Sequence, residues 1–273
     1  MTGQSETRTA LITGASAGIG AAFARLLAAK GFDLVLTARR EARLDALAAE
    51  LTRSHGITVH VLAADLARPE TPQHLFDELT ARGVAIDMLV NNAGYGVPGL
   101  YSQTGWDQQR DFIQVLVTAP AHLAHLFEPG MRARRYGRII NVASLAGLVP
   151  ASAGHTLYGA AKAFMIRFSE AHALENEGLN VHVTALCPGF TYSEFHDVTG
   201  ARELVSKLPR FMWQGADTVA RMGYEAVMRG DAVCVTGRVN RLLALLSKYL
   251  PNWLARALSR SQGRKFRITE PKT

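Results

Sequence analysis

The sequence predicts an α/β fold in which one parallel, doubly wound sheet carries helices on both of its faces. Apolar runs of strand length alternate with helix-length segments along most of the chain, which is the pattern of a βαβ series. Several runs are apolar at nearly every position, as strands covered on both faces are. No internal repeat, low-complexity tract or interdomain linker interrupts the alternation. We therefore expect one parallel sheet in a single domain.

The elements follow in order from the start of the chain. An apolar run, Thr9–Thr13, predicts the first strand and stops at Gly14. Residues 19–30 repeat apolar side chains at helical spacing and end at Gly31, a residue suited to closing a helix. The remaining prediction is a strand at 33–38, a helix at 40–53, strands within 57–65 and 86–94 with a helix after Pro69 between them, and strands within 136–144, 180–189 and 232–237 separated by helices.

The charge of the chain is concentrated at one end. Residues 238–273 hold nine basic side chains and one acid, a net +8, so residues 1–237 carry −1 of the total +7. This shift divides the chain into one domain, 1–237, and a basic extension, 238–273. Apolar residues recur in the extension at helical spacing, and Pro251 should split it into two short helices. Such helices can lie on an anionic membrane, pack on the body or contact a second subunit.

Composition argues against several classes of protein. The first ten residues are polar, without the apolar core of a signal peptide, and no apolar run approaches the ~18–20 residues of a membrane span. The basic segment contains no recognised module for reading nucleic acid. Cys187 and Cys234 lie far apart, and His122 with His125 lacks a third ligand, so we expect no metal site. The expectation is a cytoplasmic protein with buried, reduced thiols.

The stretch TGASAGIG, residues 13–20, fits two kinds of site. Its G-x-S-x-G pattern is that of an exposed serine nucleophile, here Ser16. A nucleophile elbow comes after several strands, whereas this turn follows the first one, where doubly wound folds bind a dinucleotide. There Gly14 would allow the sharp turn, Gly18 the approach of a pyrophosphate and Gly20 close packing of the helix, whose N-terminus attracts the anion. We expect the dinucleotide site, with Ser16 donating a hydrogen bond or capping the helix, and with Ala17 and Ile19 beside it.

The second strand indicates which dinucleotide binds. An NAD site places an acid after this strand to bind the ribose 2′-hydroxyl, but here the strand is followed by Arg39 and Arg40. Guanidinium groups bind a 2′-phosphate through charge-assisted hydrogen bonds. We therefore predict NADP(H) in preference to NAD(H), with Arg39 as the main contact.

A group of side chains later in the chain can transfer a proton. Tyr158 and Lys162 are four residues apart, so a helix puts them on one face. A lysine ammonium beside a phenol lowers the tyrosine pKa from its usual ~10, which would make Tyr158 a general acid/base for an alcohol oxygen. Ser144 can hold the same oxygen. The same spacing is also that of ordinary surface residues on a helix.

Together these motifs resemble the short-chain dehydrogenase/reductase family. The matching stretches are TGASAGIG at 13–20, Asp65 in AADLA, NNAG at 91–94, Ser144 in RIINVAS, YGAAK at 158–162 and PGFT at 188–191, and they span about residues 8–237 in the family's order. The resemblance implies a Rossmann fold with a doubly wound sheet of about seven strands, and an oxidoreductase that acts on CH–OH groups. Hydride would pass between a nicotinamide and a carbonyl or alcohol substrate.

The resemblance also implies a role for each matching residue. Ser144 would orient the substrate carbonyl, and Tyr158 would give it a proton. Lys162 would bind the nicotinamide ribose and lower the Tyr158 pKa. The implied cofactor contacts are Asp65 and Leu66 at the adenine, Asn92, Ala93 and Gly94 at the ribose, and Pro188, Gly189 and Thr191 along the nicotinamide and the phosphates.

One position departs from the family pattern. Many members carry a catalytic asparagine that helps to hold a water in the proton relay, and Leu116, within IQVLVTAP, stands in its place. The relay could then run through Lys162 and water alone, Gln114 or Thr118 could substitute, or turnover could be slow. This keeps an alternative function open, a cofactor-binding regulatory protein with weak turnover.

A long excursion after Pro188 is expected to form the substrate lid. It offers Phe190, Tyr192 and Phe195, which suit an apolar carbonyl compound, and Tyr95 is expected on the opposite wall. The same aromatic side chains could instead pack the excursion against the sheet. The expected partners are a small carbonyl or alcohol substrate and further copies of the chain, with peripheral membrane contact through residues 238–273 and no nucleic acid.

Overall fold

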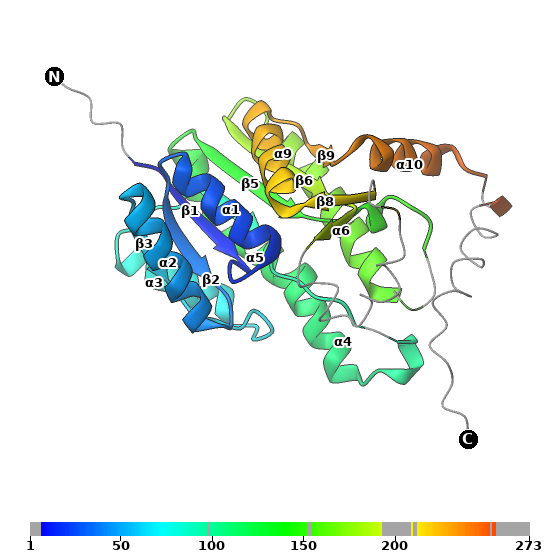
Figure 1. The fold of residues 1–273 in the computed structure, drawn as a ribbon, viewed down its shortest axis with the longest axis horizontal. Helices are drawn as coiled ribbons and strands as arrows, with labels where there is room; N and C mark the ends of the chain where they lie inside the picture. Colours follow the sequence, from blue (N-terminus) through cyan, green and yellow to red (C-terminus); the bar gives the residue numbers. More distant parts are fainter. Residues whose placement is uncertain are drawn as a thin grey trace.

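The sheet at the centre of the molecule has seven strands in the order β3-β2-β1-β4-β5-β6-β9, all parallel (Figure 1). The strands are β1 Thr9–Thr13, β2 Asp33–Thr37, β3 Val59–Val61, β4 Met88–Asn91, β5 Gly137–Val142, β6 Val181–Cys187 and β9 Val233–Val235. The order reverses between β1 and β4, and at such a switch point the loops after the strands leave a crevice. The computed structural model that gives these elements describes residues 7–97, 99–151, 154, 156–192, 209, 212–251 and 253–254.

Helices cover both faces of the sheet. On one face lie α1 (Gly18–Ala29), α2 (Glu41–His55) and α9 (Ala216–Arg229), and on the other lie α3 (Thr71–Ala81), α4 (Trp106–Ile113), α5 (Ala119–Ala133) and α6 (Thr156–Glu175). Neighbouring residues of β1 point to opposite cores, Ile12 to the first group of helices and Leu11 to the second. Because both faces are covered, burial requires apolar residues along the whole strand.

The predicted fold class is confirmed, and every predicted strand is present. Two features lie outside the sequence prediction. β7 (Phe190–Tyr192) and β8 (Trp213–Gly215) pair as a separate two-stranded sheet, and a π-helical segment, Gln114–Thr118, joins α4 to α5. Elements this short span too few residues for a hydrophobic period to show.

α10 (Arg238–Tyr249) extends from the end of β9 at one edge of the molecule (Figure 1). It begins where the charge of the chain changes and ends before Pro251, where the sequence predicts a break. Its first turn is fixed to the body through Asn240, which is 4% exposed and donates to the main-chain oxygen of Thr236 at 2.7 Å. The helix is therefore anchored at its start and leads away from the sheet.

Three observations concern membranes, metals and thiols. Within the described ranges, no helix is both long and apolar enough to cross a bilayer. Nor do these residues contain a group of three or more His, Cys, Asp or Glu side chains that could hold a metal ion. Cys187 and Cys234 are buried free thiols, and burial raises the pKa of Cys187 to about 12, so this thiol is a packing residue rather than a nucleophile. The division into 1–237 and 238–273 stays a prediction.

Candidate active site

The turn between β1 and α1 has the backbone of an anion-binding loop. Gly14 and Gly18 have φ values of +66° and +56°, which residues with a side chain rarely adopt. A Cβ on Gly20 would lie 2.8 Å from the main-chain carbonyl carbon of Gly14, so only glycine lets the helix come this close to the turn. Ala17 precedes α1 without a side-chain cap, which leaves the first N–H groups of the helix to bind a phosphate.

Thr13, the last residue of β1, ties this turn to the end of β4. Its Oγ1 accepts from the main-chain N–H groups of Asn92 and Ala93 at 2.9 and 3.0 Å. It donates to the main-chain oxygen of Val90 at 3.3 Å. The Asn92 side chain donates back to the main-chain oxygens of Thr13 and Gly14 at 2.9 and 3.2 Å. Sequence reasoning missed Thr13 as a site residue; the available signal is a hydroxyl at the strand end directly before the glycine turn.

Arg40, which follows β2, reaches over the glycine turn. Its Nε and Nη2 donate to Ser16 Oγ at 3.2 and 3.0 Å. Ser16 thus accepts from a guanidinium, and the expectation that it caps α1 is wrong, because the capping position belongs to Ala17. Arg39 is exposed, and its charge opposes the rise that burial causes in the Tyr95 pKa. Both guanidiniums lie at the turn end of β2, and Arg40 is the one that contacts the turn.

Asp65 and Leu66 follow β3 at the same edge of the sheet. Asp65 Oδ1 accepts from the N–H of Ala67 at 3.0 Å, and its main-chain oxygen accepts from the Thr71 hydroxyl at 2.7 Å. These bonds fix the carboxylate in the short loop before α3. Leu66 is buried in the core on the α3 side of the sheet, and its side chain lines the cavity beside Lys162.

Ser144, Tyr158 and Lys162 meet where β5 ends and α6 begins. Ser144 Oγ accepts from the N–H of Ala146 at 3.1 Å, and the Ser144 side chain shares a hydrogen bond with Tyr158. Lys162 Nζ donates to the main-chain oxygen of Val142 at 2.7 Å. It lies 5.7 Å from the centre of the Tyr158 ring. The fold thus brings together the three side chains that the sequence indicates for proton transfer.

Two features hold α6 against the end of β5. A Cβ on Gly147 would lie 2.7 Å from the main-chain nitrogen of Ala163, so only glycine lets the loop after β5 touch the helix. Deeper in the core, Asn141 accepts from Asn91 at 2.9 Å and donates to Ser169 at 2.9 Å. This buried chain of polar groups runs from β4 through β5 to α6. It fixes the helix that carries the phenol and the ammonium.

The pKa values at this site differ from the sequence expectation. Burial raises the pKa of Tyr158 above its usual 10, and the hydrogen bond from Ser144 only partly opposes the rise. Burial lowers the pKa of Lys162 to about 8. The expectation of a lowered Tyr158 pKa is therefore wrong for this structure, because desolvation of the phenol outweighs the effects of its neighbours.

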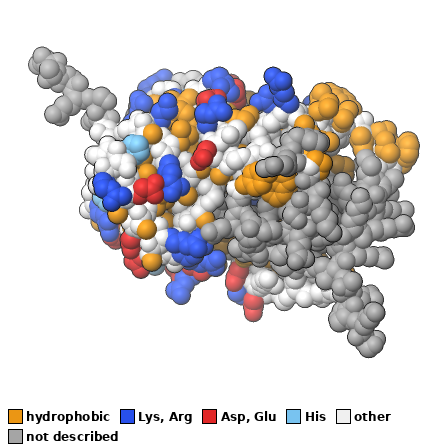
Figure 2. Space-filling view, in the orientation of Figure 1, with side chains coloured by type: hydrophobic (Ala, Val, Ile, Leu, Met, Phe, Trp, Pro, Cys, Tyr) orange, Lys and Arg blue, Asp and Glu red, His pale blue; other side chains and the backbone are white. Residues whose placement is uncertain are grey.

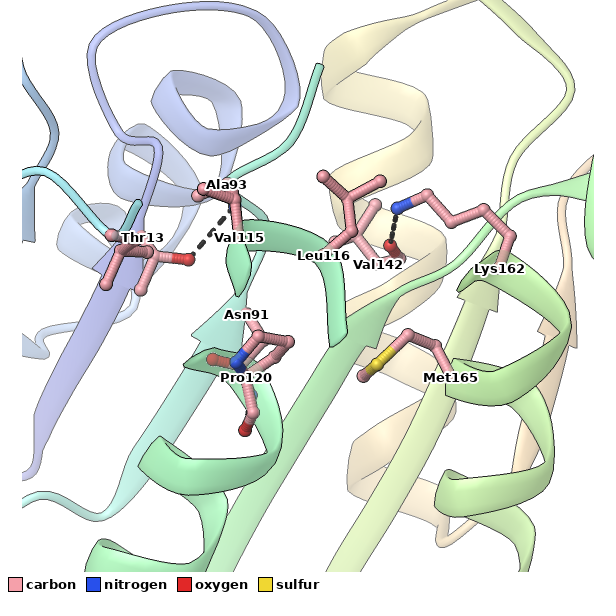
Figure 3. Close-up of a pocket in the computed structure, with 10 residues that line it drawn as sticks. Thr13, Asn91, Ala93, Val115, Leu116, Pro120, Val142, Lys162 and Met165 are labelled. Atoms are coloured by element: carbon pink, nitrogen blue, oxygen red, sulfur yellow. Dashed lines mark hydrogen bonds between the residues drawn. The ribbon is translucent and has the colours of Figure 1, made fainter. Parts of the chain in front are cut away.

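Leu116 lies beside the Lys162 ammonium, as Figure 3 shows. Its side chain is 2% exposed and belongs to the π-helical segment. Leu116 and Lys162 line a cavity of about 10 Å³ together with Thr13, Asn91 and Ala93. A cavity of this size holds about one water. The polar side chains that line this cavity come from β1, β4 and α6. Leu116 adds no group that can form a hydrogen bond.

Neither residue considered as a substitute for the relay asparagine lines this cavity. Thr118 is exposed. Gln114 Nε2 is buried and finds no hydrogen-bond partner in the part of the chain that the structure describes. Asn91 does line the cavity, and its Oδ1 is a buried acceptor without a partner in the same described part. Gly94 lies next to Leu116, because a Cβ there would be 3.7 Å from Leu116 Cγ.

Pro188 and Gly189 form the loop at the end of β6. The main-chain oxygen of Pro188 accepts from the N–H of Leu145 at 2.9 Å, which joins this loop to the one that carries the catalytic serine candidate. A Cβ on Gly189 would lie 2.7 Å from Cγ of Asn240, so α10 packs directly on the loop. Thr191 is 4% exposed and donates to the main-chain oxygen of Gly189 at 3.2 Å. Its hydroxyl therefore stabilises the loop in this structure.

Aromatic side chains border the site on two sides. Phe190 and Tyr192 pack on Trp213 across the β7–β8 pair, with ring centres 5.7 and 4.8 Å apart. Tyr95 meets Phe112 edge to face at 5.6 Å. Phe195 lies outside the described residues. A second small cavity beside the phenol is lined by Tyr158, Val97, Tyr101, Phe112 and Leu157, among others.

Comparison with known proteins finds relatives over most of the chain. The family model described as short chain dehydrogenase matches residues 8–203. An uncharacterized oxidoreductase of Myxococcus xanthus (strain DK1622) is 33% identical over 253 residues, which are 93% of this chain and 96% of that protein.

Two solved structures resemble the whole fold. A short-chain dehydrogenase from Sphingobium yanoikuyae in complex with NADPH has a TM-score of 0.78 at 31% identity and covers 97% of this chain and 98% of its own. The bulky-bulky ketone specific alcohol dehydrogenase from Comamonas testosteroni has a TM-score of 0.74 at 27% identity and covers 97% of this chain and 96% of its own.

Proposed function

The chain belongs to the short-chain dehydrogenase/reductase family, and from this membership we propose that it interconverts an apolar carbonyl compound and its alcohol with NADP(H). One observation carries the proposal. The cavity beside Lys162 is also lined by Thr13 and Ala93, so the proton-transferring side chains lie against the residues that hold the glycine turn. A cofactor bound along that turn would end next to the phenol.

The residues of the turn fit a dinucleotide. The positive φ values of Gly14 and Gly18 and the uncapped start of α1 leave a cradle of N–H groups that suits a pyrophosphate. Asp65 would hold the adenine end, and Lys162 would hold the nicotinamide ribose. When bound, the nicotinamide supplies or accepts the hydride.

The chain's own part in the reaction is to orient the substrate and move a proton. Ser144 would donate to the substrate carbonyl oxygen, and Tyr158 would transfer the phenolic proton to that oxygen during reduction. The raised Tyr158 pKa suits this direction, because it keeps the phenol protonated at neutral pH. Lys162, with a pKa of about 8, carries a positive charge at pH 7 and favours the phenolate that remains.

The preference for NADP(H) is supported by the guanidiniums that follow β2. A 2′-phosphate bound beside Ser16 would meet Arg40, which already donates to the Ser16 hydroxyl, and Arg39 extends from the same end of the strand. The relative from Sphingobium yanoikuyae was solved with NADPH, which fits this preference.

An apolar, bulky substrate is supported by the side chains that border Tyr158. Val97, Phe112 and Leu157 line the small cavity beside the phenol together with the polar side chains of Gln109 and Thr156. At the neighbouring loop, the rings of Phe190 and Tyr192 contact Trp213. The similar enzyme from Comamonas testosteroni is specific for bulky-bulky ketones. We propose ketones of that kind as the first substrates to examine.

One observation supports a second function, that of a cofactor-binding regulatory protein. Leu116 fills the wall beside Lys162 where a relay side chain would be expected. A protein that binds NADP(H) but turns over slowly would serve as a cofactor-dependent regulator. Assembly as a homo-oligomer and a cytoplasmic location stay predictions.

The two functions differ in one assay. NADPH absorbance is followed with a panel of ketones, aldehydes, steroids and lipid carbonyls, using the native protein and Tyr158→Phe. The proposed enzyme consumes NADPH with at least one carbonyl compound and loses this activity in the variant. Tight NADPH binding with no consumption for any of them supports the regulator and overturns the enzyme.

A further inference from the structure

α10 turns its side of small and polar residues to the body and its leucine side outward. Asn240, Ala244 and Ser247 face the protein and are buried or half-buried. Leu242, Leu245 and Leu246 are 56, 55 and 51% exposed. Figure 2 shows hydrophobic side chains gathered over this helix. At 100° per residue these leucines cover a continuous stripe, which is the reverse of a helix that packs its apolar face on a core.

One exposed aromatic residue lies on the stripe, and a second follows the helix in the sequence. Tyr249, the last residue of α10, is 73% exposed, and Trp253, just beyond it, is 72% exposed. Tyrosine and tryptophan combine an apolar ring with a polar atom and concentrate at the boundary between lipid and water. Val239 and Leu243, each 37% exposed, widen the same face. Contiguous apolar surface of this kind marks a site of contact with another phase or molecule.

The charge around the stripe identifies what covers it. Between Asp231 and Glu270 the sequence contains no acidic residue. Arg241 and Lys248 are seven residues apart and therefore lie on one flank of the helix. Arg241 donates from Nε to the main-chain oxygen of Val235 at 2.9 Å, and Lys248 is exposed further along this flank. A two-fold contact between copies of this chain would bring two such positive segments together, which opposes association. An anionic lipid surface attracts them and accepts the leucines as well.

We propose that α10 docks this protein on an anionic lipid bilayer, with the leucine stripe in the acyl boundary and the basic side chains at the headgroups. The anchor at Asn240 fixes the helix to the body, and its contact with Gly189 ties the docked helix to the loop at the end of β6. Docking can be tested independently of the proposed reaction, because the experiment measures binding to lipid vesicles and not enzymatic activity.

The experiment uses the full chain and sedimentation with lipid vesicles. Vesicles of phosphatidylcholine alone are compared with vesicles that contain phosphatidylglycerol, at low and at high salt. The double variant Leu242→Glu/Leu246→Glu removes the stripe. Leu174→Glu is the matched control, since Leu174 is 66% exposed on α6, outside α10.

The native protein and the Leu174→Glu control should pellet with the anionic vesicles, and less so at high salt. The double variant should lose about tenfold in partitioning for each leucine. Absence of pelleting at low salt, or equal pelleting of the double variant, overturns the proposal. Light scattering adds a further test: a native dimer that the double variant splits, with no binding to vesicles, assigns the stripe to a subunit interface instead.

Discussion

Lys162 donates a hydrogen bond of 2.7 Å to the main-chain oxygen of Val142, the last residue of β5. The bond holds the ammonium of Lys162, a residue that is 6% exposed, at the end of β5 and next to the Tyr158 ring. Burial lowers the pKa of this ammonium to about 8 from its usual 10.5. At neutral pH the buried positive charge therefore lowers the free energy of unfolding, as expected of a side chain that is retained for its chemistry.

Lys162→Met should stabilise the protein and abolish the proposed carbonyl reduction. The variant replaces a buried charge with an apolar side chain of similar length, so we expect the free energy of unfolding at pH 7 to rise by about 2 kcal/mol. The gain should shrink between pH 8 and 10.5, because there the folded lysine is already neutral while the unfolded one still binds its proton. Urea unfolding at several pH values measures both effects.

A fall in stability for Lys162→Met would show that the bond to Val142 outweighs the desolvation of the ammonium. Lys248→Met is the matched control, because Lys248 is exposed on α10. It should leave the free energy of unfolding unchanged across the same pH range.

Tyr158→Phe should lower kcat for carbonyl reduction by about 10³-fold while NADPH still binds. The substitution removes the proton donor and leaves the ring in its packed position. Activity assays measure kcat, and titration of the variant with NADPH measures cofactor binding separately. Equal losses in binding and in turnover would mean that the phenol supports the fold of the site rather than proton transfer.

The rate should also depend on pH in a direction set by the two pKa shifts. The neutral phenol is available throughout the neutral range, because burial raises the Tyr158 pKa. The Lys162 ammonium is lost as pH rises through about 8. We therefore expect kcat/KM for NADPH in the reductive direction to fall above pH 8, since this ratio reports the free enzyme. A profile that stays flat through this pH range would exclude a role for the ammonium charge.

Arg40→Ala should reduce the preference for NADPH over NADH at least as much as Arg39→Ala. Arg40 contacts the glycine turn through Ser16, whereas the sequence favoured Arg39. Loss of a charged hydrogen bond to a phosphate costs about 1.5–3 kcal/mol, or roughly tenfold to a hundredfold in kcat/KM for NADPH. The measurement is the ratio of kcat/KM for the two coenzymes in each variant. A strong NADPH preference retained by both variants would remove the guanidiniums as the determinant.

Much of the fold and of the site follows from the sequence, because long buried strands and glycine-rich turns leave local patterns. The placement of Tyr158, Lys162 and Ser144 follows from helical spacing and from the order of the strands. The sign of the Tyr158 pKa shift does not, because desolvation depends on packing from distant parts of the chain. The sequence likewise does not decide between Arg39 and Arg40 as the contact of the glycine turn. Nor does it predict that the leucines of α10 face outward, because helical periodicity identifies an apolar face but not what that face contacts.

Leu116→Asn tests whether the missing relay side chain limits turnover. Leu116 lines the water-sized cavity that Lys162 and Asn91 share, and the Asn91 Oδ1 there is a buried acceptor without a described partner. A new amide could donate to that oxygen and hold a water beside the ammonium, so we expect kcat to rise on the order of tenfold. Leu116→Ala is the control, because it enlarges the cavity without adding a polar group and should destabilise the fold by about 2–5 kcal/mol. If kcat falls in both variants, or rises equally in both, the amide has no part in the relay, and turnover is set by Tyr158, Lys162 and water as they stand.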